Sequence, residues 1–389
     1  MPRTLLLANP ENRRAASFLL AAQARNLDTT VLPWLDALHE PARLVDALHT
    51  HALLRVESPG ENFDVERALL AWGAPDHHAA HASQPPSPPH AISAREALRL
   101  SEDRGLILHP RQGFVGLSRF LAYLDDALRA APAVQPMNTP RDLALMTDKP
   151  RCHAHLHAHG VEVPPALPPV SSYDELVAQM QTHGWDRAFV KLFCGSSASG
   201  VVAYSQRQGR VSAFTSAQLV QDARGVRLYN SLRVRRYERP ADLRAVIDAL
   251  CREGVHVELW LPKLRRGPSP LDVRVVTIGG QPAHRVVRVG HSPMTNLHLG
   301  SQRGDWAALA AEIGPRAVER LEDLCRRAAA AFPQSLYAGL DVLISPRGAH
   351  LAVLEANAFG DLLPGISHGG VDTYGAELDA ALQRWREVA

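Results

Sequence analysis

Apolar and polar positions along the first 130 residues predict short buried strands that alternate with amphipathic helices. A short apolar run between turn residues is typical of a buried strand, whereas apolar positions three or four apart are typical of one face of a helix. The expected strands are residues 4–9, 29–34, 53–57 and 105–110, and the expected helices are residues 13–26, 40–50, the second half of 58–73, and 114–132. This alternation predicts a parallel α/β layer.

The pattern changes to α+β where Pro136 and Pro140 interrupt it. The expected strands beyond that point are residues 187–193, 200–205, 254–261, 271–280 and 282–290, with a hairpin over 338–357. The expected helices are residues 141–159, a stretch beginning at Ser172, one on each side of Gly314-Pro315, and 373–387. The sequence shows no internal repeat.

Length, charge and cysteine content narrow the class of protein. A chain of 389 residues is long enough for two or three domains. A net charge of +2 does not predict a nucleic-acid partner. No apolar run has the length of a signal peptide or a membrane span, and the four cysteines are scattered. We therefore expect a cytoplasmic protein with no membrane partner.

Lysine is rare in this chain, which makes each lysine informative. Of 42 basic residues, 39 are arginine and three are lysine: Lys149, Lys191 and Lys263. Lys191 lies in an apolar strand four residues before a loop of small residues at 195–200, and such a loop can present backbone N–H groups to phosphate oxygens. Most Gly/Ser loops are plain turns, but a buried ammonium that needs an anion favours the phosphate interpretation.

The hairpin at 338–357 carries polar side chains in a stretch that otherwise looks buried. Glu355 and Asn357 are two residues apart and share one face of a strand, and the turn brings Asp341 beside Glu355. Three converging oxygen donors suit Mg²⁺ carried on phosphates. The alternative is a solvated strand face that binds nothing.

Other charged residues have both a functional and an ordinary interpretation. Glu258 ends a strand ahead of an apolar run that could offer backbone groups to a purine. Arg274, Arg285 and Arg288 repeat along neighbouring strands, which suits a carboxylate or acyl-phosphate clamp, although single arginines are more often surface residues. Four histidines within 153–159 suggest zinc, but their spacing fits the zinc templates poorly.

Taken in order over residues 138–378, these stretches resemble an ATP-grasp enzyme of the glutathione synthetase and ribosomal-protein glutamate ligase kind. The resemblance implies an ATP-grasp fold, combining α/β and α+β, behind an N-terminal α/β domain similar to those that precede ATP-grasp domains. It divides the chain into residues 1–136, with a role in substrate selection, 137–253, with the phosphate loop, and 254–389, with the adenine hinge and metal site.

The resemblance also implies roles for individual residues. Contacts to ATP fall on Lys149, Lys191, Gly195, Ser196, Ser197, Gly200, Glu258, Leu259, Trp260, Leu261 and Asp272, the last on the ribose side. The metal ligands are Asp341, Glu355 and Asn357. Catalytic roles fall on Lys191, Arg274 and Arg288, and substrate contacts on Arg274, Arg288, Asn296 and Asp361.

Three residues depart from the family pattern. Ala198 replaces a loop glycine, Met294 stands where close relatives often place an arginine, and Asp361 is added after the metal-ligand motif. The change at Met294 suggests a different substrate. Asp361 either touches the amine substrate or caps a turn.

The implied function is an ATP-dependent carboxylate–amine ligase that forms an amide or peptide bond through an acyl phosphate and releases ADP and phosphate. Its cofactors would be ATP and two Mg²⁺ ions, with Mn²⁺ as a substitute. Its partners would be small-molecule or peptide carboxylates and amines. The resemblance is also compatible with a homo-oligomer. The alternatives are a phosphotransferase on the same fold and a nucleotide-binding relative without catalysis.

Overall fold

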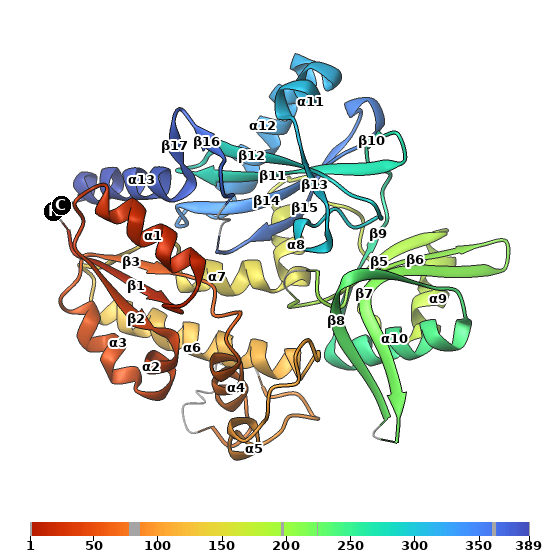
Figure 1. Cartoon of the computed structure of the whole chain (residues 1–389), viewed down its shortest axis with the longest axis horizontal. Helices are drawn as coiled ribbons and strands as arrows, with labels where there is room; N and C mark the ends of the chain where they lie inside the picture. Colours follow the sequence, from red (N-terminus) through yellow and green to blue (C-terminus); the bar gives the residue numbers. More distant parts are fainter. Residues whose placement is uncertain (1, 78–85, 196–197, 224, 360–362, 389) are drawn as a thin grey trace.

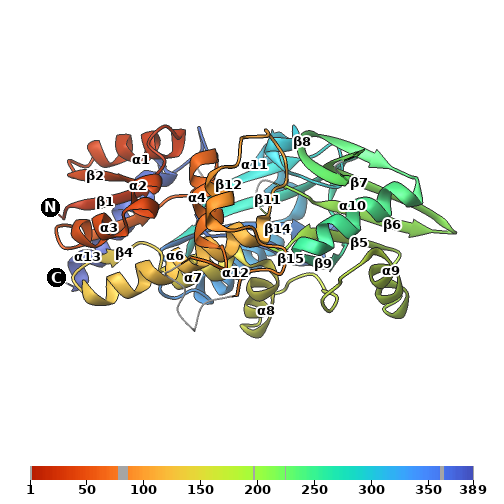
Figure 2. The same cartoon turned by 90° about the horizontal axis from the view of Figure 1, so that it is seen from below.

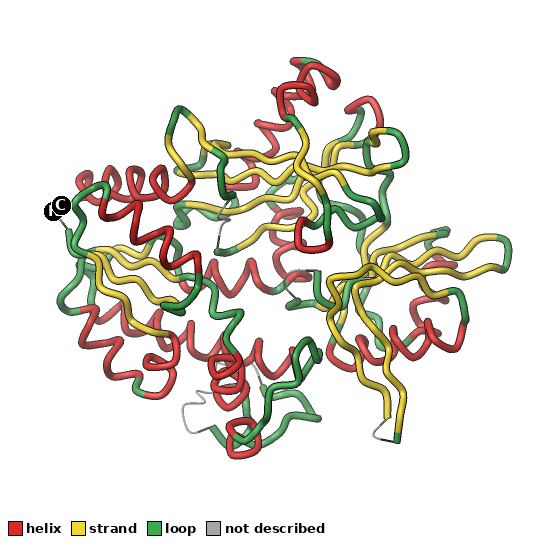
Figure 3. Tube along the Cα trace, viewed as in Figure 1, coloured by secondary structure: helices red, strands yellow, loops and turns green. Residues whose placement is uncertain are grey.

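The computed structural model describes residues 2–77, 86–195, 198–223, 225–359 and 363–388. Figure 1 shows the strands gathered into separate groups. The same grouping is clear in Figure 3, where the strands are yellow. The described residues form a four-stranded parallel sheet, a six-stranded antiparallel sheet, a five-stranded antiparallel sheet and a two-stranded antiparallel sheet.

The N-terminal sheet is the parallel layer that the alternating pattern predicts. Its strand order is β2-β1-β3-β4, and apolar runs such as "TLLLA" in β1 are buried throughout. Its strands are β1 (Thr4–Ala8), β2 (Thr29–Pro33), β3 (Leu53–Val56) and β4 (Gln135–Pro136). Its helices are α1 (Arg13–Gln23), α2 (Trp34–His39), α3 (Pro41–Leu48), α4 (Phe63–Trp72), α5 (Ala94–Leu98) and α6 (Pro110–Ala130).

The five-stranded sheet has the order β8-β7-β6-β5-β9 and a core of its own with helices α9 and α10. Its elements are β5 (Arg187–Leu192), β6 (Val202–Arg207), β7 (Arg210–Asp222), β8 (Gly225–Tyr237), β9 (Val255–Leu259), α9 (Tyr173–Thr182) and α10 (Pro240–Glu253). Strand β9, which the sequence division assigned to the third segment, pairs with β5 and so lies beside Lys191.

The six-stranded sheet follows the path β13-β12-β11-β14-β15, with β10 paired to β11. Its strands are β10 (Arg265–Arg266), β11 (Ser269–Ile278), β12 (Gln281–Val289), β13 (Gln302–Gly304), β14 (Tyr337–Ile344) and β15 (Leu351–Asn357). The remaining elements are α7 (Pro140–Thr147), α8 (Lys149–Ala158), η1 (Leu297–Leu299), α11 (Trp306–Ile313), α12 (Pro315–Ala330), η2 (Pro346–Gly348), β16 (Ser367–His368), β17 (Val371–Asp372) and α13 (Thr373–Val388). Apolar side chains of this sheet, of α7 and α8, and of the N-terminal sheet form one continuous core. Figure 2 shows α6 and α7 lying side by side.

Two sequence expectations are wrong in detail. Residues 105–110 form no strand, because Gly105 adopts a left-handed φ of 86° and Pro110 already begins α6, which leaves one bridge from Leu106 to Tyr229. The helix expected over 141–159 is two helices, because Asp148 leaves the helical region (φ −91°, ψ 95°) and caps α8, which carries a proline in its first turn.

Candidate functional site

All three lysines of the chain are paired with carboxylates among the candidate residues. The Nζ atom of Lys149 lies 2.6 Å from Glu355, that of Lys191 lies 2.6 Å from Glu258, and that of Lys263 lies 2.8 Å from Asp272. The lysine side chains are 8–12% exposed. We call these three pairs, together with Arg274, Arg288 and Asp341, the charge belt.

Lys191 belongs to the charge belt because successive side chains of β5 point to opposite faces of the sheet. Ala188, Val190 and Leu192 are buried in the core of the five-stranded sheet, so Lys191 points to the opposite face. Strand β9 pairs Lys191 with His256, and Glu258 follows two residues later on the same face. Burial would raise the pKa of Glu258, but the charge of Lys191 and the neighbouring His256 imidazole, with 3.1 Å between Nε2 and Oε1, hold it at about 2.

Lys149 joins the start of α8 to both antiparallel sheets. The carboxylate of Asp148 accepts a hydrogen bond from the N–H of Arg151 and fixes the beginning of the helix. The backbone N–H of Lys149 donates to the carbonyl of Phe193 after β5, and its ammonium donates to the carbonyl of Gly195 and to Glu355 on β15, both at 2.6 Å. Although burial opposes it, the charge of Glu355 raises the pKa of Lys149, so the ammonium keeps its proton.

The loop after β5 is tightly packed where the structure describes it. A Cβ on Gly200 would come within 2.9 Å of Leu192 and Leu250, and its φ of 64° is left-handed, so glycine is required there. Ala198 also has a left-handed φ of 58°, at the position where the family pattern has glycine. Ser196 and Ser197 lie outside the described residues.

The six-stranded sheet supplies the other half of the charge belt. Register pairs Asp341 of β14 with Arg274 of β11 on one side and with Glu355 of β15 on the other, as the sequence predicts for the hairpin. Asp341 accepts hydrogen bonds from Arg274 and from Arg288 Nη1, the latter at 3.1 Å, while Arg288 Nε lies 2.8 Å from Asp272. Burial raises the pKa of Asp341, but the two guanidinium groups outweigh it and hold that pKa well below its usual range.

The donor set on β14 and β15 fits a hard cation. Asp341 and Glu355 are direct neighbours across the two strands, and Asn357 faces Gly339 two positions further along. The amide Nδ2 of Asn357 donates to the carbonyl of Gly339 at 2.9 Å, which orients the side chain and leaves its oxygen as an acceptor. Two carboxylates and one amide oxygen are ligands that Mg²⁺ prefers.

A cavity of about 20 Å³ lies between the two antiparallel sheets at this point. Lys149, Glu258 and Glu355 line it together with apolar residues of α7, α8 and β15. One residue predicted for each of phosphate, adenine and metal binding therefore lines this small space.

Other predicted residues make contacts of a different kind or lie outside the described residues. Asn296 caps the short helix η1 by accepting a hydrogen bond from the N–H of His298. Trp260 packs against Phe189 of β5, with 5.4 Å between ring centroids, just after β9 ends. Asp361 lies outside the described residues.

Sequence reasoning missed Lys263, His256 and Thr295. Thr295 and Lys263 both hydrogen-bond Asp272, which is buried. The signal that could have found Lys263 was present, since it is one of only three lysines. Nothing local marks Thr295, because its partners Lys263 and Asp272 lie on other segments. His256 precedes Glu258 by two residues on β9, so the spacing that places them on one face was present in the sequence.

The histidines of α8 use ring nitrogens for backbone contacts. His153 Nε2 lies 2.7 Å from the carbonyl oxygen of Pro164, His155 Nε2 lies 2.7 Å from that of Ala331, and His159 Nδ1 lies 2.8 Å from that of His155. These nitrogens are engaged with carbonyl oxygens, which is the ordinary interpretation of the run.

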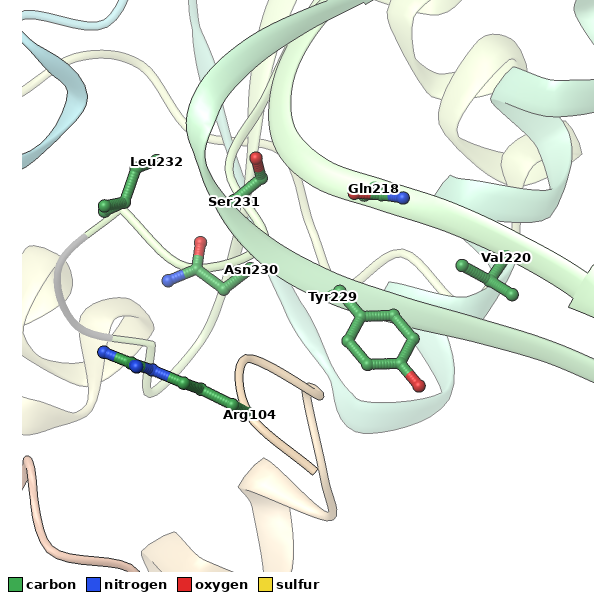
Figure 4. Close-up of a pocket in the computed structure, with 7 residues that line it drawn as sticks. All are labelled: Arg104, Gln218, Val220, Tyr229, Asn230, Ser231 and Leu232. Carbon is green, nitrogen blue, oxygen red and sulfur yellow. The ribbon is translucent and has the colours of Figure 1, made fainter. Parts of the chain in front are cut away.

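A larger hollow of about 450 Å³ lies on the long β7–β8 hairpin and contains none of the predicted residues. Its lining is Arg104, Gln218, Val220, Tyr229, Asn230, Ser231 and Leu232 (Figure 4). With one cation and no carboxylate, it lacks the paired charges that distinguish the charge belt.

Comparison with known proteins identifies the fold. No protein-family model matches the sequence, and no curated protein is significantly similar to it. Among solved structures, the ATP-grasp ligase PsnB complexed with a minimal precursor matches with a TM-score of 0.52 and 17% identity over 99% of this chain and 100% of that chain. D-cycloserine synthetase DcsG matches with a TM-score of 0.54 and 14% identity, covering 98% of this chain and 99% of its own.

D-alanine–D-alanine ligase from Bacillus anthracis, complexed with ATP, matches with a TM-score of 0.53 and 10% identity over 99% of this chain and 98% of that chain. The chain therefore has the ATP-grasp fold, behind an N-terminal α/β layer. This confirms the fold that the sequence resemblance implied. Within the described residues, no helix is both long and apolar enough to cross a membrane.

Proposed function

We propose that this protein is an ATP-dependent carboxylate–amine ligase that forms an amide or peptide bond and releases ADP and phosphate. The observation that carries the proposal is the position of Lys149, whose ammonium lies 2.6 Å both from the loop carbonyl of Gly195 and from the candidate metal ligand Glu355. A cation between a phosphate-type loop and a metal ligand suits a phosphoryl group that bridges the two.

The proposed reaction has two steps. A substrate carboxylate oxygen attacks the γ-phosphorus of ATP, the bond to the β,γ-bridging oxygen breaks, and an acyl phosphate and ADP result. An amine then attacks the acyl carbon, phosphate leaves, and the amine loses a proton. No covalent bond to the protein is required.

The charge belt supplies what these steps need. Lys149 and Lys191 would hold phosphate oxygens, and Arg274 and Arg288 would hold the acyl phosphate. Asp341, Glu355 and Asn357 would hold two Mg²⁺ ions, or Mn²⁺ in their place, which neutralise charge on the transferring phosphoryl group.

The surrounding segments would bind the nucleotide and exclude water. Residues 258–261 would line the adenine and Asp272 the ribose side, while the loop at 195–200 would close over a hydrolysable intermediate. Asn296 and Asp361 are proposed substrate contacts. The N-terminal segment, residues 1–136, would select the substrate because the carboxyl ends of its parallel strands are where α/β sheets bind ligands.

Nucleotide product analysis tests the proposal. Purified protein would receive ATP and Mg²⁺ with pooled amino acids, small acids and peptides, the last because the structural neighbour PsnB is complexed with a precursor peptide. Substrate-stimulated ADP and free phosphate are expected, with loss in Lys191→Ala and Glu355→Gln and retention in Arg210→Ala, an exposed hairpin residue.

Other products would indicate a different activity. ADP without free phosphate would mean a phosphotransferase, AMP and pyrophosphate would mean adenylation, and ATP binding without turnover across a broad pool would favour a non-catalytic nucleotide binder. Each of these results would contradict the ligase proposal.

A further inference from the structure

We propose that His90, His109 and Glu253 form a binding site for a divalent transition-metal ion of the Zn²⁺ type. One potential ligand atom of each residue lies within 4.8 Å of the others, and this is the one group of three or more histidine, cysteine or acidic residues with such spacing in the part of the chain that the structure describes. The site is separate from the charge belt and does not depend on the proposed function.

Three distant segments converge to make the site. His90 lies ahead of α5, His109 directly precedes α6, and Glu253 is the last residue of α10. His90 Nε2 lies 3.0 Å from Glu253 Oε1, and the imidazole rings of His90 and His109 are nearly parallel, with an interplanar angle of 24°. Ligand atoms around a tetrahedral zinc with bonds of about 2.0–2.1 Å are themselves about 3.3 Å apart. The His90–Glu253 pair, at 3.0 Å, is close to this spacing, and the other two separations are at most 4.8 Å.

His109 combines an uncommon backbone conformation with a buried ring nitrogen that makes no hydrogen bond to any described residue. Its backbone has a left-handed φ of 43°, which is uncommon for a residue other than glycine. Its Nδ1 atom is buried and has no hydrogen-bond partner among the described residues. A buried ring nitrogen without a partner, beside a second imidazole and a carboxylate, suits a metal ligand better than a simple His–Glu pair.

Glu253 is oriented by the backbone of the next segment. Its Oε2 accepts a hydrogen bond from the N–H of Arg111 in the first turn of α6, at 3.2 Å, and its Oε1 faces His90. Outer contacts of this kind fix metal-binding carboxylates.

The donor set selects the ion. Two imidazoles and one carboxylate suit Zn²⁺ with a water in the fourth position, whereas Mg²⁺ prefers oxygen ligands throughout.

The position of the site gives the ion a structural role. Glu253 immediately precedes Gly254, whose carbonyl accepts the hydrogen bond from the N–H of Phe193, and β9 begins at the next residue. An ion shared with His90 and His109 would tie the N-terminal segment to the end of the five-stranded sheet that carries Lys191. That sheet has a core of its own, so the ion would limit its movement relative to the rest of the molecule.

Zinc titration of the full-length, untagged protein tests the proposal. Equilibrium dialysis in excess Mg²⁺ and without nucleotide should give one Zn²⁺ per chain. Co²⁺ at the same site should give the visible absorption of a tetrahedral complex. His90→Ala and His109→Ala should each weaken binding at least about tenfold, since even outer-contact changes typically cost 10–100-fold. Zinc should also raise the melting temperature of the wild type but not of these variants.

The matched control is the double variant His155→Ala/His159→Ala, which changes the histidine run of α8 and should bind zinc like the wild type. His90 is exposed, so its variant should fold, and circular dichroism checks this. Zinc binding that is absent in the wild type, unchanged in the His90 and His109 variants, or lost only in the α8 variant would overturn the proposal. None of these results bears on ligase turnover, which is measured separately.

Discussion

Replacing Lys191 with methionine would leave the carboxylate of Glu258 buried without its main counter-charge. The side chain of Glu258 is 4% exposed and that of Lys191 12% exposed, so water cannot take over the role of the ammonium. Breaking a buried ion pair by removing one partner typically costs about 3–5 kcal/mol. His256 stays beside the carboxylate, and we therefore expect a loss near the lower end, about 3 kcal/mol.

The pKa of Glu258 gives a second measure of how much this carboxylate contributes to the free energy of unfolding. Its folded value of about 2 lies below the ordinary 4.5, so its stabilising contribution is fully present above pH 4.5 and is lost as the pH falls towards 2. At about 1.4 kcal/mol per pH unit this difference corresponds to about 3 kcal/mol. In Lys191→Met, burial acts without the ammonium and raises that pKa, so the contribution of Glu258 should change sign and weaken the fold as the pH rises.

Hydrogen exchange and urea unfolding measure the two effects. At neutral pH the amides of β5 and β9 should exchange about a hundredfold faster in Lys191→Met, as about 3 kcal/mol of local stability requires. Urea unfolding between pH 3.5 and 7 should show that the free energy of unfolding of Lys191→Met depends differently on pH from that of the wild type. The double variant Lys191→Met/Glu258→Gln should recover part of the loss, because it removes the stranded charge.

Two results would refute this reasoning. One is a Lys191→Met protein that loses less than about 1 kcal/mol, which would mean that the carboxylate reaches water or that His256 suffices as its partner. The other is an unchanged dependence of stability on pH, which would mean that Glu258 is not the titrating group.

Three further predictions test the site. Glu355→Gln should lower kcat at least about a hundredfold, and it should also lower the melting temperature, because the carboxamide no longer neutralises the ammonium of Lys149. Steady-state kinetics and calorimetry check this, and unchanged kcat would remove Glu355 from the metal set. Gly200→Ala should lower the free energy of unfolding by about 1–3 kcal/mol, because its Cβ would come within 2.9 Å of two leucines. Gly209→Ala has a similar positive φ but open space and should lower it by about 1 kcal/mol. Equal losses in urea unfolding would contradict the packing argument. Asp148→Ala and Ser172→Ala each remove a helix cap and should each cost about 1 kcal/mol, but only the first should lower turnover, since it frees the start of α8 beside the charge belt.

The sequence predicted those features that depend on local pattern. The hairpin at 338–357 alternates with a period of two around a clear turn, so the neighbours Asp341 and Glu355 followed from spacing alone. The buried runs at 4–9, 29–34 and 53–57 likewise predicted the parallel sheet, because buried parallel strands read as continuous apolar stretches.

Features that depend on distant pairing could not be read in the same way. Strand β5 meets β9 across 67 residues, and only that pairing brings Lys191 to Glu258. The long β7–β8 hairpin was not predicted, because its strands alternate weakly between buried and exposed positions. The break at Asp148 followed cap chemistry that a helical pattern over 141–159 conceals.

The concentration of every lysine in the charge belt has a practical consequence. Reagents that acylate primary amines usually modify many surface lysines, but here each side-chain amine is nearly buried and ion-paired within one region. Slow, stoichiometric acylation of side chains would therefore report on the opening of this region, and a peptide map would have three positions to follow. Arginine side chains on the surface would not react, so acylation of side-chain amines would be selective for this region.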